Sequence, residues 1–117
     1  MNKYNILRAA KVLERKDYPF DFISWPFCIT GLVWRINHGS INLDSKEICD
    51  FAAQFFELDC KVITELSVAS QLPAGMAMAI DRQVAIKCLK HLANTGEVDW
   101  RRALEVVTNE KPCYRQS

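Results

Sequence analysis

The sequence predicts an all-α protein: a compact bundle of five or six helices around a buried central helix at residues 26–38. In several segments apolar residues recur at three- and four-residue spacing, which is the period of an amphipathic helix. Aspartates and glycines stand at the ends of these segments, where helix caps are found. Because the 117 residues are 50% hydrophobic and 25% charged, we expect one globular domain spanning residues 1–117.

The first expected helix covers residues 4–15, "YNILRAAKVLER". Its inward face is an apolar stripe made of Ile6, Ala9, Ala10 and Leu13. Another face carries a basic row at i, i+3 and i+7, made of Arg8, Lys11 and Arg15. Two interpretations of the basic row are open: a solvated helix face, or an electrostatic docking site for an acidic partner.

An aromatic segment, "YPFDFISWPFC" at residues 18–28, follows this helix, and its two prolines prevent a continuous helix through it. Covering the core is its favoured role, but five aromatic residues exceed what one loop beside one helix needs, and aromatic residues are enriched at interfaces. We expect Trp25 and Phe27 in the core, and an exposed patch formed by Tyr18, Phe20 and Phe22 beside the basic row. The predicted partner-binding residues are therefore Tyr18, Phe20, Phe22, Arg8, Lys11 and Arg15.

The central helix is predicted from "FCITGLVWRINHG", which is apolar nearly all round, as buried helices are. Ser24 is placed to cap it, with Pro26 in its first turn, where a missing N–H costs nothing. Gly39 suits the left-handed residue that follows a helix. Gly31 is expected to allow the close approach of a neighbouring element.

Four more helices are expected, each after an aspartate that can accept a hydrogen bond from the first turn. These caps are Asp44, Asp59, Asp81 and Asp99. Glu47 is placed to complete a capping box with Asp44, and Gly96 ends the helix that follows Asp81. Residues 70–79 form the longest expected loop, and the polar tail at residues 111–117 is expected to fray.

Charge is distributed unevenly along the chain, although the net charge is only +1. Residues 1–16 carry a net charge of +4, residues 17–60 of −5, and residues 61–117 of +2. A general nucleic-acid binder has a stronger basic excess, so we do not expect a nucleic-acid partner. We expect a protein partner instead.

The cysteines and the apolar runs indicate a cytoplasmic protein. Five cysteines occur, an odd number with no C-x-x-C spacing, which is typical of reduced thiols. The start, "MNKYNILRAAK", lacks the apolar core of a secretion signal. The longest uncharged run, residues 23–34, is too short to span a bilayer, so no membrane contact is expected.

Cys28 is the strongest candidate for chemistry, because a thiol in the first turn of a helix is biased toward the thiolate. Its nearest histidine in the sequence, His38, lies about 15 Å away along a continuous helix, which is too far for it to act as the base. The alternative is that Cys28 is a small buried apolar residue. Cys88 and His91 could share a metal, but no further ligands follow at a metal-site spacing. We therefore expect no catalytic residues, no cofactor and no metal.

The segment "HLANTGEVDWRRALEVV" could form a helix-turn-helix with Arg101 and Arg102 early on its second helix. Three carboxylates would then approach the DNA phosphates and repel them: Glu97, Asp99 and Glu105. DNA binding is therefore a secondary alternative.

Three stretches resemble a family of small, uncharacterised helical domains from bacteria and their phages: "ILRAAKVLERKDY", "CITGLVWRINHG" and "AIDRQVAIKCLKHLA". That family has an "LRAA" helix, then a segment like C-x-x-G-A, then commonly W-N-D before a helix that starts R-x-x-x-V. The match covers residues 6–92 and keeps Cys28 and Gly31, but it has Leu32 where alanine is common and "AID" where W-N-D is common. The resemblance implies a helical fold and supplies no catalytic residues, because the family has no assigned activity.

The predicted function is a non-enzymatic protein-interaction or regulatory module, such as a phage or mobile-element accessory protein that binds a host protein. Self-association through the aromatic patch is a variant of this prediction. Two alternatives stay open: a small cysteine-dependent enzyme or redox sensor that uses Cys28, and a helix-turn-helix DNA binder. A small-molecule pocket beneath the central helix, with residues 70–79 as its lid, is also open.

Overall fold

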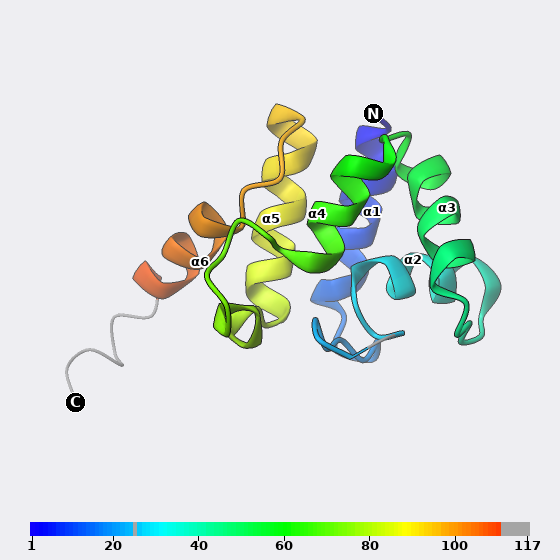
Figure 1. The fold of residues 1–117 in the computed structure, drawn as a ribbon, viewed down its shortest axis with the longest axis horizontal. Helices are drawn as coiled ribbons and strands as arrows, with labels where there is room; N and C mark the ends of the chain where they lie inside the picture. The colour runs from blue at the N-terminus through cyan, green and yellow to red at the C-terminus, as the bar shows by residue number, and fades with distance from the viewer. Residues whose placement is uncertain (25, 111–117) are drawn as a thin grey trace.

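The computed structural model describes residues 1–24 and 26–110, and within these ranges the chain forms six α-helices, one short 3₁₀ helix and no strand (Figure 1). The all-α prediction is confirmed. In order, the elements are α1 (Lys3–Glu14), α2 (Ile29–His38), α3 (Ser45–Phe56), α4 (Cys60–Val68), η1 (Met76–Ala79), α5 (Arg82–Thr95) and α6 (Trp100–Asn109). The predictions of a buried Trp25 and of a frayed tail at residues 111–117 fall outside the described residues.

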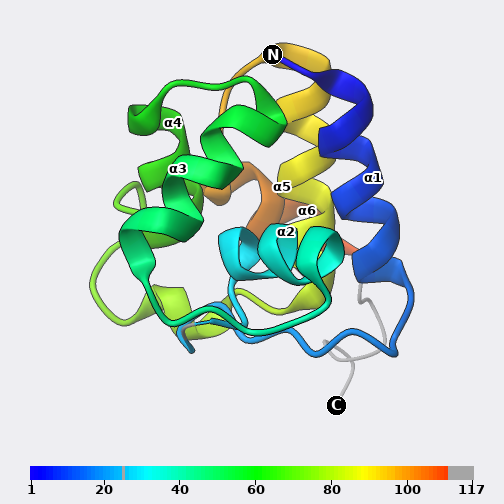
Figure 2. The same cartoon turned by 90° about the vertical axis from the view of Figure 1, so that its right-hand side faces the viewer.

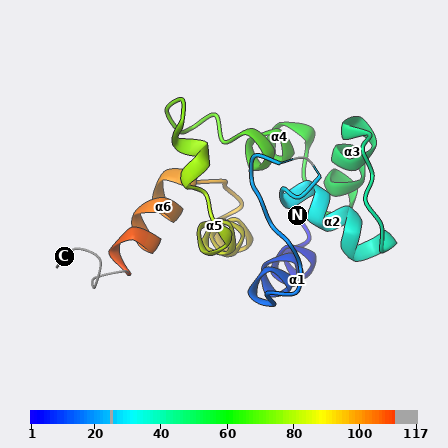
Figure 3. The ribbon, with the colours of Figure 1, turned by 90° about the horizontal axis from the view of Figure 1, so that it is seen from below.

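Helices α1 and α5 lie side by side and antiparallel, with extensive contact between them (Figure 2). Helix α6 packs against α5 at one end of the molecule, and α3 lies at the other end (Figures 1 and 3). Helix α2 packs against both α3 and α4. The first and fifth helices are therefore brought together only by the tertiary fold.

One hydrophobic core joins all six helices. Its large, completely buried side chains include Ile6 and Leu13 in α1, Leu32 in α2, Phe56 in α3, Leu66 in α4, Leu89 in α5 and Trp100 in α6. Burying one such side chain contributes about 1.5–3 kcal/mol. The core thereby fixes which helix faces remain available to a partner.

All four predicted aspartate caps are confirmed. Each carboxylate accepts a hydrogen bond from the backbone N–H three residues later, in the pairs Asp44–Glu47, Asp59–Val62, Asp81–Val84 and Asp99–Arg102. The predicted capping box is wrong, because the N–H of Asp44 donates to the side chain of Asn42 at 2.8 Å. The carboxylate of Glu47 accepts from the same Asn42 at 2.7 Å.

Helix α2 is the buried helix that the sequence predicts, but it begins at Ile29 rather than at residue 26. Cys28, not Ser24, is its N-cap residue, and no side chain caps it. The main chain turns before the helix, with the N–H of Phe27 donating to Ser24 O at 2.6 Å, so Ser24 and Pro26 belong to the preceding loop. The first five residues of α2 are buried, whereas His38 at its end is exposed.

Gly31 fulfils its predicted role of allowing close approach, and its neighbour is the main chain of the aromatic segment. A Cβ atom added at Gly31 would lie 1.7 Å from the carbonyl oxygen of Pro26. No side chain fits at that distance from rigid backbone. Gly31 therefore lets the aromatic segment fold back against the start of α2.

Within residues 1–24 and 26–110, no helix combines the length and the hydrophobicity needed to cross a bilayer.

Candidate functional site

The aromatic segment does not form the exposed patch that the sequence predicts. Phe22 is only 5% exposed, and its ring meets the buried ring of Trp100 edge-on, with centroids 5.1 Å apart. Phe20 and Tyr18 are partly buried and pack against the core. The prediction is wrong for Phe22 because the core at the start of α6 needs a large side chain to cover Trp100. Self-association through Phe20 and Phe22 loses its basis for the same reason.

Phe27 is also placed differently from its prediction, since it is only partly buried. The guanidinium carbon of Arg35 lies over its ring, 5.1 Å from the centroid, and 5.9 Å from the centroid of Tyr18. Contacts of this kind attract a guanidinium to the face of an aromatic ring. The two rings thus flank an arginine of α2.

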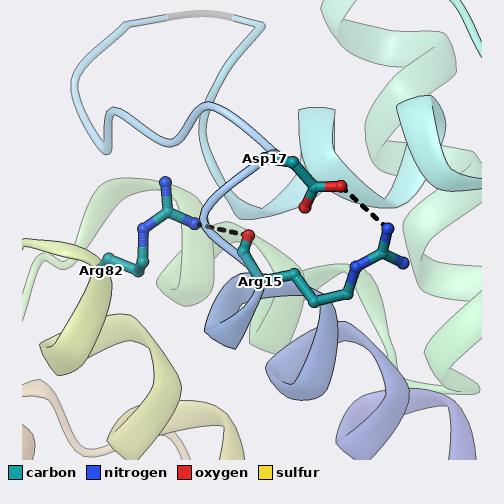
Figure 4. Close-up of polar contacts among 3 residues, drawn as sticks. All are labelled: Arg15, Asp17 and Arg82. Atoms are coloured by element: carbon teal, nitrogen blue, oxygen red, sulfur yellow. Dashed lines mark hydrogen bonds and ion pairs between the residues drawn. The ribbon is translucent and has the colours of Figure 1, made fainter.

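Two arginines hold the start of the aromatic segment in place. From α5, Arg82 donates to Leu13 O at 2.8 Å and to Tyr18 O at 2.7 Å. From α2, Arg35 donates to Pro19 O at 2.8 Å. Figure 4 shows Arg82 reaching the end of α1. The bond to Leu13 O satisfies a carbonyl group that the end of α1 leaves open, and the other two satisfy carbonyl groups of the loop after it.

The three residues of the basic row differ in whether their side chains interact with other described residues. Arg15 forms an ion pair with Asp17 at 2.8 Å (Figure 4) and lies over the ring of Tyr18. Arg8 and Lys11 are exposed, and neither has a side-chain hydrogen bond or an ion pair within the described part of the chain. Two of the three predicted cations are thus available to a partner.

Two exposed apolar residues lie beside Arg8 and Lys11, and neither was among the predicted binding residues. Tyr4 is 75% exposed and Leu7 is 38% exposed. With Arg8 and Lys11 they line a shallow hollow of about 220 Å³. We call these four residues the α1 face. Their spacing of i, i+3, i+4 and i+7 marks one side of a helix and could have revealed the face from the sequence.

A second hollow of about 430 Å³ lies between residues 72–79 and α6, with a mainly apolar lining that includes Leu72, Met76 and Leu104. The alternative predicted from the sequence was a small-molecule pocket beneath the central helix, with this loop as its lid. The observed hollow instead lies between this loop and α6. Arg101 and Glu105 at its edge give the rim both signs of charge.

Cys28 and His38 are not brought together. Cys28 is 2% exposed, and its sulfur lies 3.2 Å from the hydroxyl of Thr30. His38 lies at the other end of α2, with its ring stacked on Trp34 at a centroid distance of 3.7 Å. The fold therefore supplies no His38 base for a Cys28 nucleophile.

Cys88 is buried in the core, and this burial raises the pKa of its thiol to about 12. The thiol stays protonated near neutral pH, which makes it a poor metal ligand and a poor nucleophile. No group of three metal-binding side chains occurs among the described residues.

A thiol-reactivity experiment checks these placements. With iodoacetamide at pH 8, we expect the exposed Cys60 to be modified before Cys28 and Cys88, which stay protected until denaturant is added. Raising the pH from about 7 to about 10 should not speed the reaction at Cys88, because the raised pKa and the burial of Cys88 both withhold its thiolate. Peptide mass spectrometry gives the order of modification, and Cys60→Ser is the control. Fast modification of Cys28 in the folded protein would restore the cysteine-enzyme alternative.

Helices α5 and α6 are the two helices that a helix-turn-helix would use. Arg101 and Arg102 are exposed on α6, and the side chain of Arg101 donates to Gln71 O at 3.2 Å. The exposed carboxylates Glu97 and Glu105 lie nearby in the sequence. Because both signs of charge occur around the start of α6, these described residues form no basic stripe. DNA binding stays an untested alternative.

Comparisons of the chain with protein-family models, curated proteins and solved structures found no match. The fold and the α1 face define a small all-α domain that presents a basic and apolar helix surface. The resemblance to small phage domains stays a prediction.

Proposed function

We propose that this protein is a non-enzymatic protein-interaction module that docks an acidic, amphipathic segment of a partner protein on the α1 face. The observation that carries the proposal is the combination of a strongly exposed Tyr4 with two cations, Arg8 and Lys11, that lack partners in the described part of the chain.

The geometry of α1 supports this proposal. The inward side of the helix is fully committed to the core, because Ile6, Ala9 and Leu13 are completely buried. The outward side can therefore contact a partner without disturbing the fold. A tyrosine beside basic side chains is a frequent combination at binding hot spots, since the ring gives a large contact area at a small entropy cost.

The charges define the chemistry of the partner. Arg8 and Lys11 lie one turn apart, so carboxylates at matching spacing on a partner helix would pair with both. Tyr4 and Leu7 would contact apolar residues between those carboxylates. Electrostatic attraction of this kind raises the association rate and falls with added salt.

A peptide-binding experiment tests the proposed function. The probe is a helical peptide of about 18 residues with leucines along one side and flanking glutamates, and the comparison peptide has lysines in place of the glutamates. We expect the acidic peptide to bind wild-type protein in fluorescence anisotropy, and the double change Arg8→Glu and Lys11→Glu to weaken binding at least about tenfold. Tyr4→Ala should weaken it as well, because it removes the apolar anchor.

The matched control is the double change Lys61→Glu and Arg102→Glu, which alters the net charge equally on exposed positions of α4 and α6. It should leave binding within about twofold of wild type. Equal loss with both double variants would show that only net charge matters, and equal binding of both peptides would contradict the proposal. Phe22→Ala is unsuitable as a docking variant, because Phe22 lies in the core.

The origin of this protein and the identity of its partner form a second, more specific proposal. The hypothesis of a phage or mobile-element accessory protein acting on a host protein is supported by the sequence resemblance alone. Capture of one host protein by the wild type, and its loss with the Arg8 and Lys11 variant but not with the control, would support it.

A further inference from the structure

Arg35 is the one arginine or lysine that is at least nine-tenths buried in the described part of the chain, with a residual exposure of 8%. It lies in the last turns of α2, among apolar neighbours. No carboxylate forms an ion pair with it in residues 1–24 and 26–110. A buried charge without a counter-charge is costly, so its environment calls for an explanation.

The hydrogen bonds of Arg35 are incomplete. A guanidinium has five N–H donors, and here one nitrogen, Nη2, donates to Pro19 O at 2.8 Å. The Nε atom is buried and has no hydrogen-bond partner among the described residues. The rings of Tyr18 and Phe27 lie beside the guanidinium, so further bonds must be made in its own plane.

Neighbouring charges do not neutralise Arg35. Burial is the main cause that lowers the pKa of Arg35, and the nearby positive charge of Arg82 lowers it further. Asp17 lies close by, but its carboxylate is paired with Arg15 at 2.8 Å (Figure 4). Tyr18 and Cys28 act in the opposite direction and favour the charged form.

Arg35 lines a pocket of about 230 Å³ between the end of α2 and the start of the aromatic segment. The other side of the pocket is formed by the residues that follow α2, Gly39 to Ile41. The side chain of Ser40 has no hydrogen bond within the described ranges and is exposed at the rim. The pocket is smaller than a typical ligand site of about 300–1,000 Å³, so only a small group fits.

We propose that this pocket binds a small carboxylate, held by the guanidinium of Arg35 and reached from the Ser40 side. A planar carboxylate can accept two parallel hydrogen bonds from the in-plane donors of a guanidinium. A single negative charge also suits a pocket that Asp17 lines together with Arg35. The site is separate from the α1 face and does not depend on the proposed function.

Titration of the intact protein with acetate, succinate and phosphate tests the proposal, with the Nε–H signal of Arg35 in ¹H–¹⁵N spectra as the readout. Ionic strength is held constant with sodium chloride. We expect acetate or succinate to shift this signal saturably, with a dissociation constant of the order of millimolar. The Nε–H signal of Arg102, an exposed arginine, should not shift. An unmoved Arg35 signal, or tighter binding of phosphate than of either carboxylate, would overturn the proposal.

Two variants place the binding at this pocket. Arg35→Lys keeps the charge but removes the planar donors, and it should abolish saturable binding in calorimetry, while Arg102→Lys should not. Ser40→Glu adds a negative charge at the exposed rim and should weaken binding at least about tenfold. Its control is Asn94→Glu, at an exposed position near the end of α5. Should Arg35→Lys fail to fold, unchanged binding to Ser40→Glu would by itself refute the site.

The carboxylate could belong to a free small acid or to the end of a polypeptide, and a second titration distinguishes these sources. A tetra-alanine peptide with a free C-terminal carboxylate is compared with the same peptide amidated at its C-terminus. Binding of the free peptide at least tenfold tighter than succinate, with loss on amidation, would assign a chain terminus as the ligand. Equal or tighter binding of succinate would assign a free acid.

Discussion

Replacing Trp100 with alanine is expected to lower the free energy of unfolding by about 4 kcal/mol. Trp100 is completely buried at the start of α6, and its indole N–H donates to Glu65 O at 2.8 Å. The change would remove the largest side chain of the core and leave that carbonyl without its donor. It would also deprive Phe22 of its edge-on ring partner. Since small domains have only about 5–15 kcal/mol of stability, much of the total would be lost.

Urea denaturation followed by circular dichroism measures this effect, and Trp34→Ala is the matched control. Trp34 is only partly buried, although its ring also packs edge-on against Phe51 at 5.4 Å. The control should cost about 1–2 kcal/mol, because less area is removed from the core. Equal losses for the two tryptophans would contradict the placement of α6 against the aromatic segment.

The change Gly31→Ala is expected to cost about 3 kcal/mol, although alanine is the better helix former by about 1 kcal/mol. The added Cβ would lie 1.7 Å from Pro26 O, a backbone atom that cannot turn aside as a side chain does. The start of α2 and the aromatic segment would have to separate. The fluorescence of the tryptophans and the denaturation midpoint should therefore both change.

Gly39→Ala is the control for this prediction. Gly39 has a φ of +70° after α2, and no atom of the described residues lies within 4 Å of a Cβ added there. Its cost is only the strain of a left-handed alanine, about 1–2 kcal/mol. If Gly31→Ala proved as stable as wild type, the close approach of Pro26 to α2 would be wrong.

The burial of Phe22 agrees with the favoured role of the aromatic segment, which is to cover the core, but the prediction of which rings are exposed was wrong. The residues of this segment carry no helix period, because the two prolines interrupt the main chain, so no repeat indicates which rings point inward. Phe22 is buried since Trp100, far along the sequence, lies next to it in the fold. The exposed tyrosine of the proposed docking face is Tyr4, which lies on a regular helix whose spacing could have revealed it.

Arg35 was missed for a related reason. Arg35 was assigned no role within a helix predicted to be apolar, whereas the structure places its guanidinium over the ring of Tyr18 and in a hydrogen bond to Pro19 O. A lone charge in an otherwise apolar segment is a usable signal for a buried cation. Its hydrogen-bond partners and the pocket beside it could not be inferred, because they come from the aromatic segment and from the residues after α2.

The sequence by itself determined the helices, their aspartate caps and their inward faces, because hydrogen bonds and side-chain spacing within one helix are local properties of the chain. The start of α2 departed from the prediction where a contact with the preceding segment intervened. Only the tertiary structure decided which aromatic rings are buried, which cations of α1 lack a partner among the described residues, and that Arg35 lines a pocket. Those outcomes depend on contacts between residues distant in the chain, and no local pattern records them.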